Sequence, residues 1–154
     1  MTPTPFVYGD FKIRREWRTM PETIFRAWAD PAIKAKWFGG SSDQWEVLRR
    51  SSDFRVGGVE LEEGRFRKTG MVSLYQARIH FIEENARLVY AYDMWIDGAP
   101  LSTSLATVLL EPAAGGAKFT YSEHLVFLDG KDGTASRIEG MEQLFAAMEK
   151  VVLG

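Results

Sequence analysis

Apolar and charged side chains alternate along residues 11–19, close to the start of the chain. Phe11, Ile13 and Trp17 fall in one phase of this alternation, whereas most of the charged residues fall in the other. A period of two residues is typical of a strand that buries one face. Arg15 is the exception, because it is a charged residue in the apolar phase.

Two segments that begin with proline follow this strand and predict two short helices in series. Pro21 and Pro31 each suit the first position of a helix, where the N–H that proline lacks has no intrahelical partner. We expect the first helix over residues 21–29. We expect the second over residues 31–38, because Gly39-Gly40 then ends the helical pattern.

The next part of the chain consists of apolar segments separated by turn signals, among them the hairpin signal Asp97-Gly98. We expect strands over residues 45–53, 59–66, 71–82, 87–96, 101–110 and 117–127. Long strands joined by short turns are typical of an antiparallel meander and not of βαβ units.

Two of these strands show their alternation clearly. The inward phase of the strand over residues 71–82 holds Met71, Tyr75, Ala77, Ile79 and Phe81. In the strand over residues 101–110, three leucines share one phase with two threonines, in the order Leu101, Thr103, Leu105, Thr107 and Leu109. The only two histidines, His80 and His124, fall in phases that point outward.

The last predicted element is an amphipathic C-terminal helix. Ser136-Arg137-Ile138-Glu139 has the form of a capping box, which satisfies free N–H groups at the start of a helix. Behind it, apolar residues recur at intervals of three and four, namely Ile138, Met141, Phe145, Met148 and Val152. A helix of about 16 residues is about 24 Å long, which is enough to cross a sheet. Gly140 within it predicts a close approach of the sheet or of a ligand.

Composition and charge exclude several classes of protein. With 154 residues, 45% hydrophobic and 26% charged, the chain is expected to form one globular domain over residues 1–154. It has no cysteine, which excludes disulfides, thiolate metal sites and cysteine nucleophiles. A net charge of −2 provides no basic field for nucleic acid. No secretory signal and no apolar run long enough to span a membrane is visible, so we expect a cytoplasmic protein.

Several segments together resemble one known family. The stretch MPETIFRAWADP at residues 20–31, followed by Lys36-Trp37-Phe38, resembles the opening of one branch of the START-like (SRPBCC) superfamily. That branch is named after an activator of the heat-shock-protein-ninety ATPase. DFRVGG at residues 53–58 and RLVYAYDM at residues 87–94 resemble later parts of the same branch. Residues 127–144 resemble a bacterial subgroup labelled SRPBCC proteins.

The resemblance implies a fold and a general kind of function. The fold is α+β, of the helix-grip type also found in birch-pollen allergens. It consists of a curved antiparallel sheet of about seven strands, two short helices after the first strand, and a long C-terminal helix that crosses the sheet over an internal cavity. Relatives in the superfamily include lipid carriers, hormone receptors and polyketide cyclases or aromatases.

Arg15 and Glu123 are the first candidate site residues. Each is a charged residue in the apolar phase of its strand. The resemblance implies that the first and last strands pair, so the two charges are expected to face each other inside the protein. A buried charge without a partner is costly, and each therefore needs the other or a polar ligand. The alternative is that a bulge shifts the phase and one of them points to solvent.

Aromatic and sulfur-containing side chains supply the rest of the predicted ligand-binding surface. Four tyrosines lie in inward phases, where their hydroxyls can orient the polar end of an apolar ligand: Tyr75, Tyr90, Tyr92 and Tyr121. The C-terminal helix adds Met141, Phe145 and Met148. Trp37 and Phe38 are expected to form a lid at the mouth of the cavity. Packing of the core is the alternative explanation for the tyrosines and the methionines.

Three functional hypotheses remain. The first is binding of a small hydrophobic or aromatic molecule, with Arg15, Glu123 and the tyrosines at its polar end. The second is a cyclase, aromatase or hydratase in which Glu123 or a tyrosine acts as acid and base. The third is a module that interacts with a chaperone, although the near-neutral charge shows no patch for that partner. No catalytic triad or metal-binding spacing is present, so no cofactor or metal is expected, and a homodimer is left open.

Overall fold

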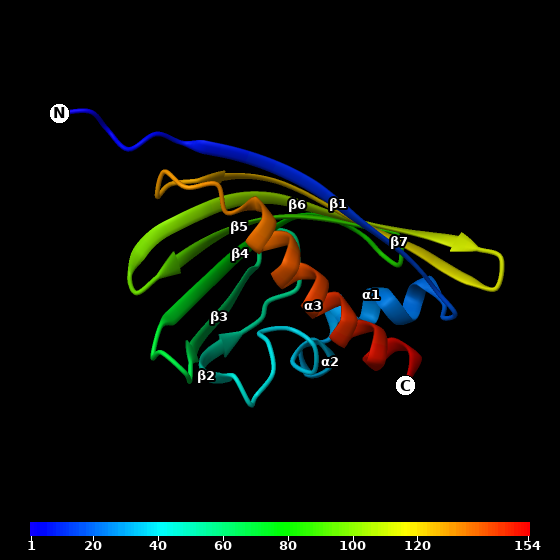
Figure 1. Cartoon of the computed structure of the whole chain (residues 1–154). Coiled ribbons are helices and arrows are strands. Elements are labelled where there is room, and N and C mark those ends of the chain that lie inside the picture. The colour runs from blue at the N-terminus through cyan, green and yellow to red at the C-terminus, as the bar shows by residue number, and fades with distance from the viewer.

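The computed structural model describes all 154 residues and contains seven strands and three helices. In chain order they are β1 (Val7–Trp17), α1 (Pro21–Ala29), α2 (Pro31–Lys34), β2 (Trp45–Ser51), β3 (Val59–Phe66), β4 (Val72–Glu83), β5 (Arg87–Ile96), β6 (Ala99–Ala113), β7 (Gly116–Phe127) and α3 (Thr134–Leu153). Figure 1 shows one curved sheet with all three helices on its concave side and α3 lying across it. The predicted α+β helix-grip architecture is therefore confirmed.

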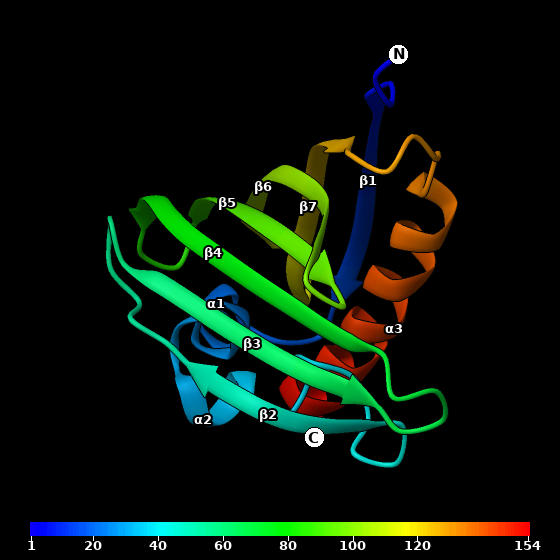
Figure 2. The same cartoon turned by 90° about the vertical axis from the view of Figure 1, so that its left-hand side faces the viewer.

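The sheet is antiparallel throughout and has the strand order β1-β7-β6-β5-β4-β3-β2. Each strand from β2 to β7 pairs with its neighbour in the sequence, which confirms the predicted meander. β1 then pairs with β7, so the first and last strands lie side by side as the resemblance implied. β1 and β2 are the two edges of the sheet, at opposite sides of the molecule in Figure 2.

Proline begins both short helices, as predicted, but the second helix is shorter than expected. α2 begins at Pro31 and ends at Lys34, and the side chain of Asp30 caps it by accepting a bond from Ala32 N at 2.9 Å. Beyond Lys34 the backbone changes to tighter i→i+3 bonds, one of them from Trp37 N to Lys34 O. The second helix predicted over residues 31–38 is therefore wrong in its C-terminal half.

α3 begins earlier than the sequence pattern indicated. It starts at Thr134 with Gly133 as its N-cap residue, and no side chain caps it. Arg137 N already donates to Gly133 O at 2.9 Å, so Ser136 lies inside the helix and cannot cap it. The predicted capping box is therefore wrong, whereas the amphipathic helix behind it is confirmed. None of the three helices combines the length and the apolar character needed to cross a membrane.

The structure corrects the predicted placement of one side chain in β4 and shows which phase of β6 is buried. The register of β4 against β5 shifts between Ile79 and Phe81, and this bulge turns Phe81 outward, where it is 39% exposed. The inward position predicted for Phe81 is therefore wrong. In β6 the leucine phase lies on the outer face, because Leu105 and Leu109 are exposed. The inner face of β6 therefore begins with small polar residues, Ser102 and Ser104, both buried.

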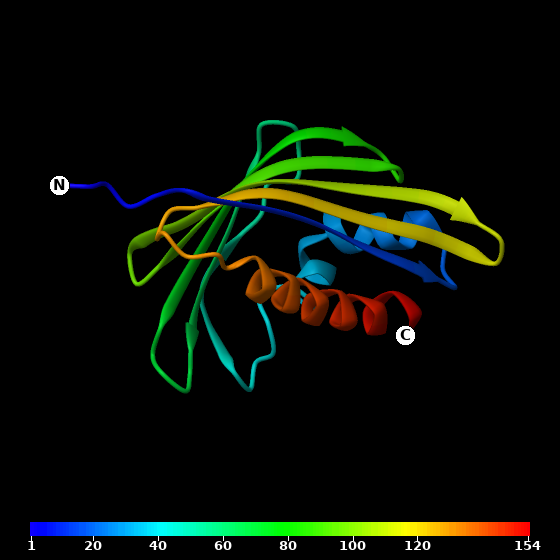
Figure 3. The same cartoon turned by 45° about the horizontal axis from the view of Figure 1, so that its top comes forward.

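The apolar core fills one end of the space under the sheet. α1 packs against α3, β6 and β7. Its Trp28 lies against Tyr121 of β7 and Phe145 of α3, with ring centroids 6.5 Å and 6.3 Å apart. Figure 3 shows α1 beside the C-terminal half of α3 only. The aromatic side chains of α1 therefore pack under the sheet beside the C-terminal half of α3. The N-terminal half of α3 faces the sheet with no part of α1 beside it.

Candidate functional site

A pocket of about 460 Å³ lies between the sheet and the N-terminal half of α3. Fourteen of its 26 lining residues are hydrophobic, and they come from most of the strands and from α3. The charged residues of the lining are Glu46, Glu62, Asp129 and Arg137. No residue of α1 lines this pocket.

The four predicted tyrosines meet at this pocket. Tyr75 of β4, Tyr90 and Tyr92 of β5 and Tyr121 of β7 all line it, and all four are buried. The rings of three of them contact in series, with the centroids of Tyr75 and Tyr92 5.0 Å apart and those of Tyr90 and Tyr92 6.1 Å apart. The alternation of each strand places these residues on the concave face, so their position follows directly from the sequence pattern.

Burial raises the pKa of all four phenols, because a phenolate at these positions would lose its hydration. The negative charge of Glu123 adds to the increase for each of them. The four hydroxyls therefore stay protonated at physiological pH, and each can donate a hydrogen bond.

Glu123 lies behind the tyrosines on the inner face of β7 and is fully buried. Its Oε1 accepts a hydrogen bond from the Tyr121 hydroxyl at 2.6 Å. Its Oε2 accepts bonds from the hydroxyls of Tyr92 at 2.7 Å and Ser104 at 2.8 Å. These donors replace the water that a buried carboxylate loses, but a buried charge also needs an opposite charge.

Arg137, in the first turn of α3, supplies that charge. Its Nη1 lies 3.2 Å from Glu123 Oε2 and donates to the Tyr92 hydroxyl at 2.9 Å, while Nη2 donates to the Ser102 hydroxyl at 2.7 Å. The side chain is only 11% exposed, and its guanidinium lies over the rings of Tyr92 and Phe127. Burial alone would lower the pKa of Arg137, but Tyr92 and Glu123 raise it above its ordinary value, so the charge is retained.

The polar groups of this network already have hydrogen-bond partners within the protein. Both oxygens of Glu123 already accept hydrogen bonds, and the Tyr92 hydroxyl both donates to Glu123 and accepts from Arg137. A general acid or base must come within hydrogen-bond reach of a substrate. Because these groups already bond one another, the arrangement orients Tyr92 and Tyr121 and attaches α3 to the sheet.

Arg15 and Glu123 do not meet, contrary to the expected pairing. The register of β1 against β7 places Arg15 opposite Phe119 and Glu123 opposite Phe11, so the two charges are separated along the strands. Arg15 instead forms an ion pair with Glu142 of α3, and its side chain is 36% exposed. The first and last strands pair as expected, but a shared pair of strands does not bring these two positions together.

The other predicted site residues divide between the pocket and the core. Phe38 and Met141 line the pocket. Phe145 and Met148 are buried in the core. Trp37 is also buried, and its Nε1–H donates to a backbone carbonyl of α1 at 2.8 Å. This bond attaches the turn after α2 to α1, and Trp37 does not line the pocket.

Sequence reasoning missed Arg137, Ser102 and Ser104 as members of the site. Arg137 was assigned to the capping box, although it precedes Met141 by four residues and therefore lies on the buried stripe of the helix. The two serines lie in the phase of β6 that also holds Ala106, Val108 and Leu110, and this phase is the buried one. A charged residue on an apolar helical stripe was the signal available in the sequence.

Gly140 borders the same pocket. A Cβ atom added there would meet no atom within 4 Å. The close approach of the sheet that this glycine predicted is therefore wrong, and the space beside it is open.

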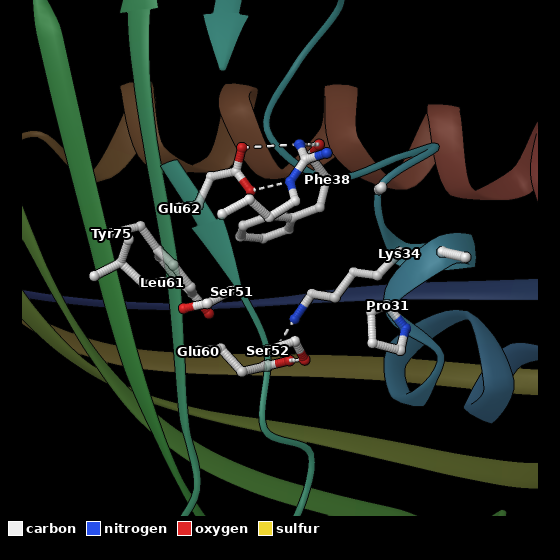
Figure 4. Close-up of a pocket in the computed structure, with 12 residues that line it drawn as sticks. Pro31, Lys34, Phe38, Ser51, Ser52, Glu60, Leu61, Glu62 and Tyr75 are labelled. Carbon is white, nitrogen blue, oxygen red and sulfur yellow. Dashed lines mark hydrogen bonds and ion pairs between the residues drawn. The ribbon is translucent and has the colours of Figure 1, made fainter. Parts of the chain in front are cut away.

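A second pocket of about 370 Å³ lies next to the first, beside α2. Figure 4 shows Lys34 reaching from α2 toward Glu60 of β3, with Ser52 beside that carboxylate. Lys34 Nζ lies 2.9 Å from Glu60 Oε1, and the Ser52 hydroxyl donates to Glu60 Oε2 at 2.6 Å. Lys34 and Glu60 are both buried, so the interior contains a second ion pair besides that of Glu123 and Arg137.

Tyr75 lies at the boundary of the two pockets, which it lines together with Phe38 and Glu62. Its ring packs edge-on against that of Phe38, with the centroids 4.9 Å apart. Its hydroxyl is buried and has no hydrogen-bond partner. A buried hydroxyl without a partner costs about 1–3 kcal/mol. It is therefore a group that a bound molecule can stabilise.

The sequence itself matches one protein family over residues 18–152. The family is described as Activator of Hsp90 ATPase homolog 1-like protein. The chain belongs to this family. The START-like (SRPBCC) branch expected from the sequence is thereby confirmed. Among curated proteins, none is similar enough to match.

Solved structures of bacterial proteins have the same fold over almost the whole chain. A protein from Rhizobium leguminosarum is 32% identical, with 96% of each chain covered and a TM-score of 0.90. The Mll3558 protein from Rhizobium loti is also 32% identical, with 96% of this chain and 99% of that chain covered and a TM-score of 0.86. An AHSA1-like protein from Aeromonas hydrophila, 17% identical over 94% of this chain and 92% of its own, has a TM-score of 0.70 and shares the fold.

Proposed function

We propose that the protein binds a small hydrophobic or aromatic molecule in the pocket between the sheet and the N-terminal half of α3. The observation that supports this is a pocket of about 460 Å³ with a mainly hydrophobic lining. Pockets that hold small molecules have volumes of about 300–1,000 Å³ and apolar walls with a few placed polar groups. Both properties are found together here.

The packing of α3 supports the proposal further. The helix is attached to the sheet near its N-terminal end by Arg137 and near its C-terminal end by Glu149, which accepts a bond from Trp17 Nε1 at 3.1 Å. Between these two attachments, Gly140 presents no side chain toward the pocket it borders. A helix held at both ends cannot collapse onto the sheet, so the space beside its N-terminal half stays open.

Two measurements test this proposal. Extraction of the purified protein followed by mass spectrometry is expected to detect a bound small molecule. Nile red, an uncharged dye that fluoresces strongly in apolar surroundings, is expected to bind with one molecule per chain. A Gly140→Leu variant places an isobutyl group beside the pocket, and we expect it to weaken dye binding at least tenfold.

Ala146→Leu provides the matched control, because Ala146 is exposed on α3 and does not line the pocket. Replacing a helical glycine with leucine raises helix propensity, and urea denaturation of both leucine variants checks that a loss of binding does not result from unfolding. Equal dye binding by the wild type and Gly140→Leu, or equal loss in both leucine variants, would contradict the proposal.

A further inference from the structure

We infer that the ligand of this pocket is an uncharged ring compound with a hydrogen-bond acceptor, such as a carbonyl oxygen, that meets the hydroxyl of Tyr75. This inference rests on the proposed function and specifies the chemical class of molecule that the same pocket accepts. It depends on which polar groups of the interior already have partners and which one does not.

Both buried cations are already neutralised by buried carboxylates. Arg137 pairs with Glu123 at 3.2 Å, and Lys34 pairs with Glu60 at 2.9 Å. An anionic ligand would therefore enter without a free positive charge to replace its hydration, and burial of an unpaired charge costs several kcal/mol.

The walls of the pocket also disfavour an anion. Three carboxylates line it, those of Glu46, Glu62 and Asp129, against the single guanidinium of Arg137. Glu46 and Glu62 pair with Arg65 and Arg50, at 2.8 Å and 2.6 Å, so these acids attract a cationic ligand only weakly. Asp129 has no ion-pair partner, but it is exposed, so its charge stays hydrated and attracts a cationic ligand only weakly. The balance of charge around the pocket therefore favours an uncharged molecule over either ion.

Among the fully buried polar atoms of the pocket lining, the Tyr75 hydroxyl is the one that lacks a partner. Only two buried side-chain polar atoms have no hydrogen-bond partner, Trp28 Nε1 and the Tyr75 hydroxyl, and of these residues only Tyr75 lines a pocket. Burial raises the pKa of Tyr75, so its hydroxyl remains a neutral donor. A neutral buried donor is best satisfied by a neutral acceptor on the ligand.

The position of Tyr75 also orients the ligand. Tyr75 lies where the larger pocket meets the smaller one, beside Phe38. The ring system then occupies the larger apolar pocket against Tyr92, Tyr121 and Met141, and its acceptor points toward the boundary with the second pocket.

Four compounds that share one ring system test whether the pocket prefers a neutral acceptor, an anion, a cation or a plain hydrocarbon. They are naphthalene, 2-acetylnaphthalene, naphthalene-2-carboxylate and 2-naphthylmethylammonium. Their affinities are measured by displacement of Nile red from the wild type, Tyr75→Phe and Tyr8→Phe, with the affinity for the dye determined for each protein. Tyr8 is exposed and lies outside both pockets, so Tyr8→Phe removes the same hydroxyl where no ligand is bound.

We expect the wild type to bind 2-acetylnaphthalene more tightly than either charged analogue. Tyr75→Phe should weaken binding of 2-acetylnaphthalene by roughly two- to tenfold, the usual range for one neutral hydrogen bond, and leave the affinity for naphthalene unchanged. Tyr8→Phe should match the wild type with every compound.

The inference is overturned if the carboxylate or the ammonium compound binds more tightly than the ketone. It is also overturned if Tyr75→Phe changes the affinities for ketone and hydrocarbon equally. Either result leaves the proposed function intact as long as the wild type binds Nile red and naphthalene. Failure of Nile red and all four compounds to bind the wild type would instead contradict the proposed function itself.

Discussion

Arg137 on α3 and Glu123 on β7 form a buried ion pair with 3.2 Å between Nη1 and Oε2. The pair joins the first turn of the helix to β7, the second strand of the sheet. Arg137 also donates to the Ser102 hydroxyl on the neighbouring strand β6. The same carboxylate orients the hydroxyls of Tyr92 and Tyr121 at the wall of the pocket. One interaction therefore determines both where α3 begins to cross the sheet and how two tyrosines face the pocket.

Removal of one partner of this pair should destabilise the protein strongly. Arg137→Met keeps much of the length of the side chain but leaves Glu123 as a buried charge without an opposite charge. We expect the free energy of unfolding, measured by urea denaturation, to fall by about 3–5 kcal/mol. The double variant Glu123→Gln/Arg137→Met contains neither charge and should recover part of this loss.

Arg65→Met is the control for this prediction, because Arg65 pairs with Glu46 on the surface, where both side chains are almost half exposed. An exposed pair contributes about 1 kcal/mol or less. If Arg137→Met cost no more than Arg65→Met, the buried pair would not be what attaches α3 to the sheet.

Tyr75→Phe should stabilise the ligand-free protein. The substitution removes a buried hydroxyl that has no hydrogen-bond partner and keeps the ring packed against Phe38 and Tyr92. We expect a gain of about 1 kcal/mol in the free energy of unfolding. The measurement is thermal and urea denaturation beside Tyr8→Phe, which should not change. A clear loss of stability would mean that the Tyr75 hydroxyl is satisfied within the protein.

Gly140→Ala should also raise stability, for a different reason. Gly140 lies inside α3, and a methyl group there meets no atom within 4 Å. Alanine in a helix is favoured over glycine by about 1 kcal/mol. Urea denaturation should therefore show a gain of about that size. Destabilisation would indicate that α3 must bend or approach the sheet at this position.

The buried tyrosines predict loss of stability at alkaline pH. Burial raises the pKa of Tyr75, Tyr90, Tyr92 and Tyr121 in the folded protein, whereas in the unfolded chain a tyrosine ionises near its ordinary value of about 10. Their contribution to stability is therefore complete below about pH 10. It is lost as the pH rises from there toward the folded values, because the unfolded chain releases these protons first.

The test follows tyrosinate absorbance and near-ultraviolet circular dichroism together during alkaline titration. Ionisation of these four tyrosines should coincide with the loss of tertiary structure. Formation of tyrosinate by all five tyrosines of the chain while the fold stays intact would contradict the burial of the hydroxyls.

The elements themselves could be predicted from the sequence because their patterns are local. The alternation around Ile13 and Trp17 placed β1, and the helical stripe through Met141, Phe145 and Met148 placed α3. The exceptions arose where one local signal competed with another. Ser136 and Glu139 had the spacing of a capping box, but Gly133 offers its carbonyl to Arg137 N first, and the helix starts there.

The partner of Glu123 could not be predicted in the same way. The phase of β7 showed that Glu123 points inward, and this was correct. Which cation reaches it depends on the register of β1 against β7, which moves Arg15 away, and on the path of α3, which brings Arg137 in. Residues 123 and 137 are joined by a loop and lie on different elements, so no periodicity relates them.

The amino-acid sequence alone determined the order of strands and helices and the inward direction of the tyrosines, because the side-chain period of a strand or helix depends only on neighbouring residues. Only the tertiary structure decided that α1 fills one end of the space under the sheet and leaves a pocket at the other. It also left the Tyr75 hydroxyl without a partner there. Both outcomes depend on how distant elements pack in three dimensions, and side-chain periodicity carries no information about that packing.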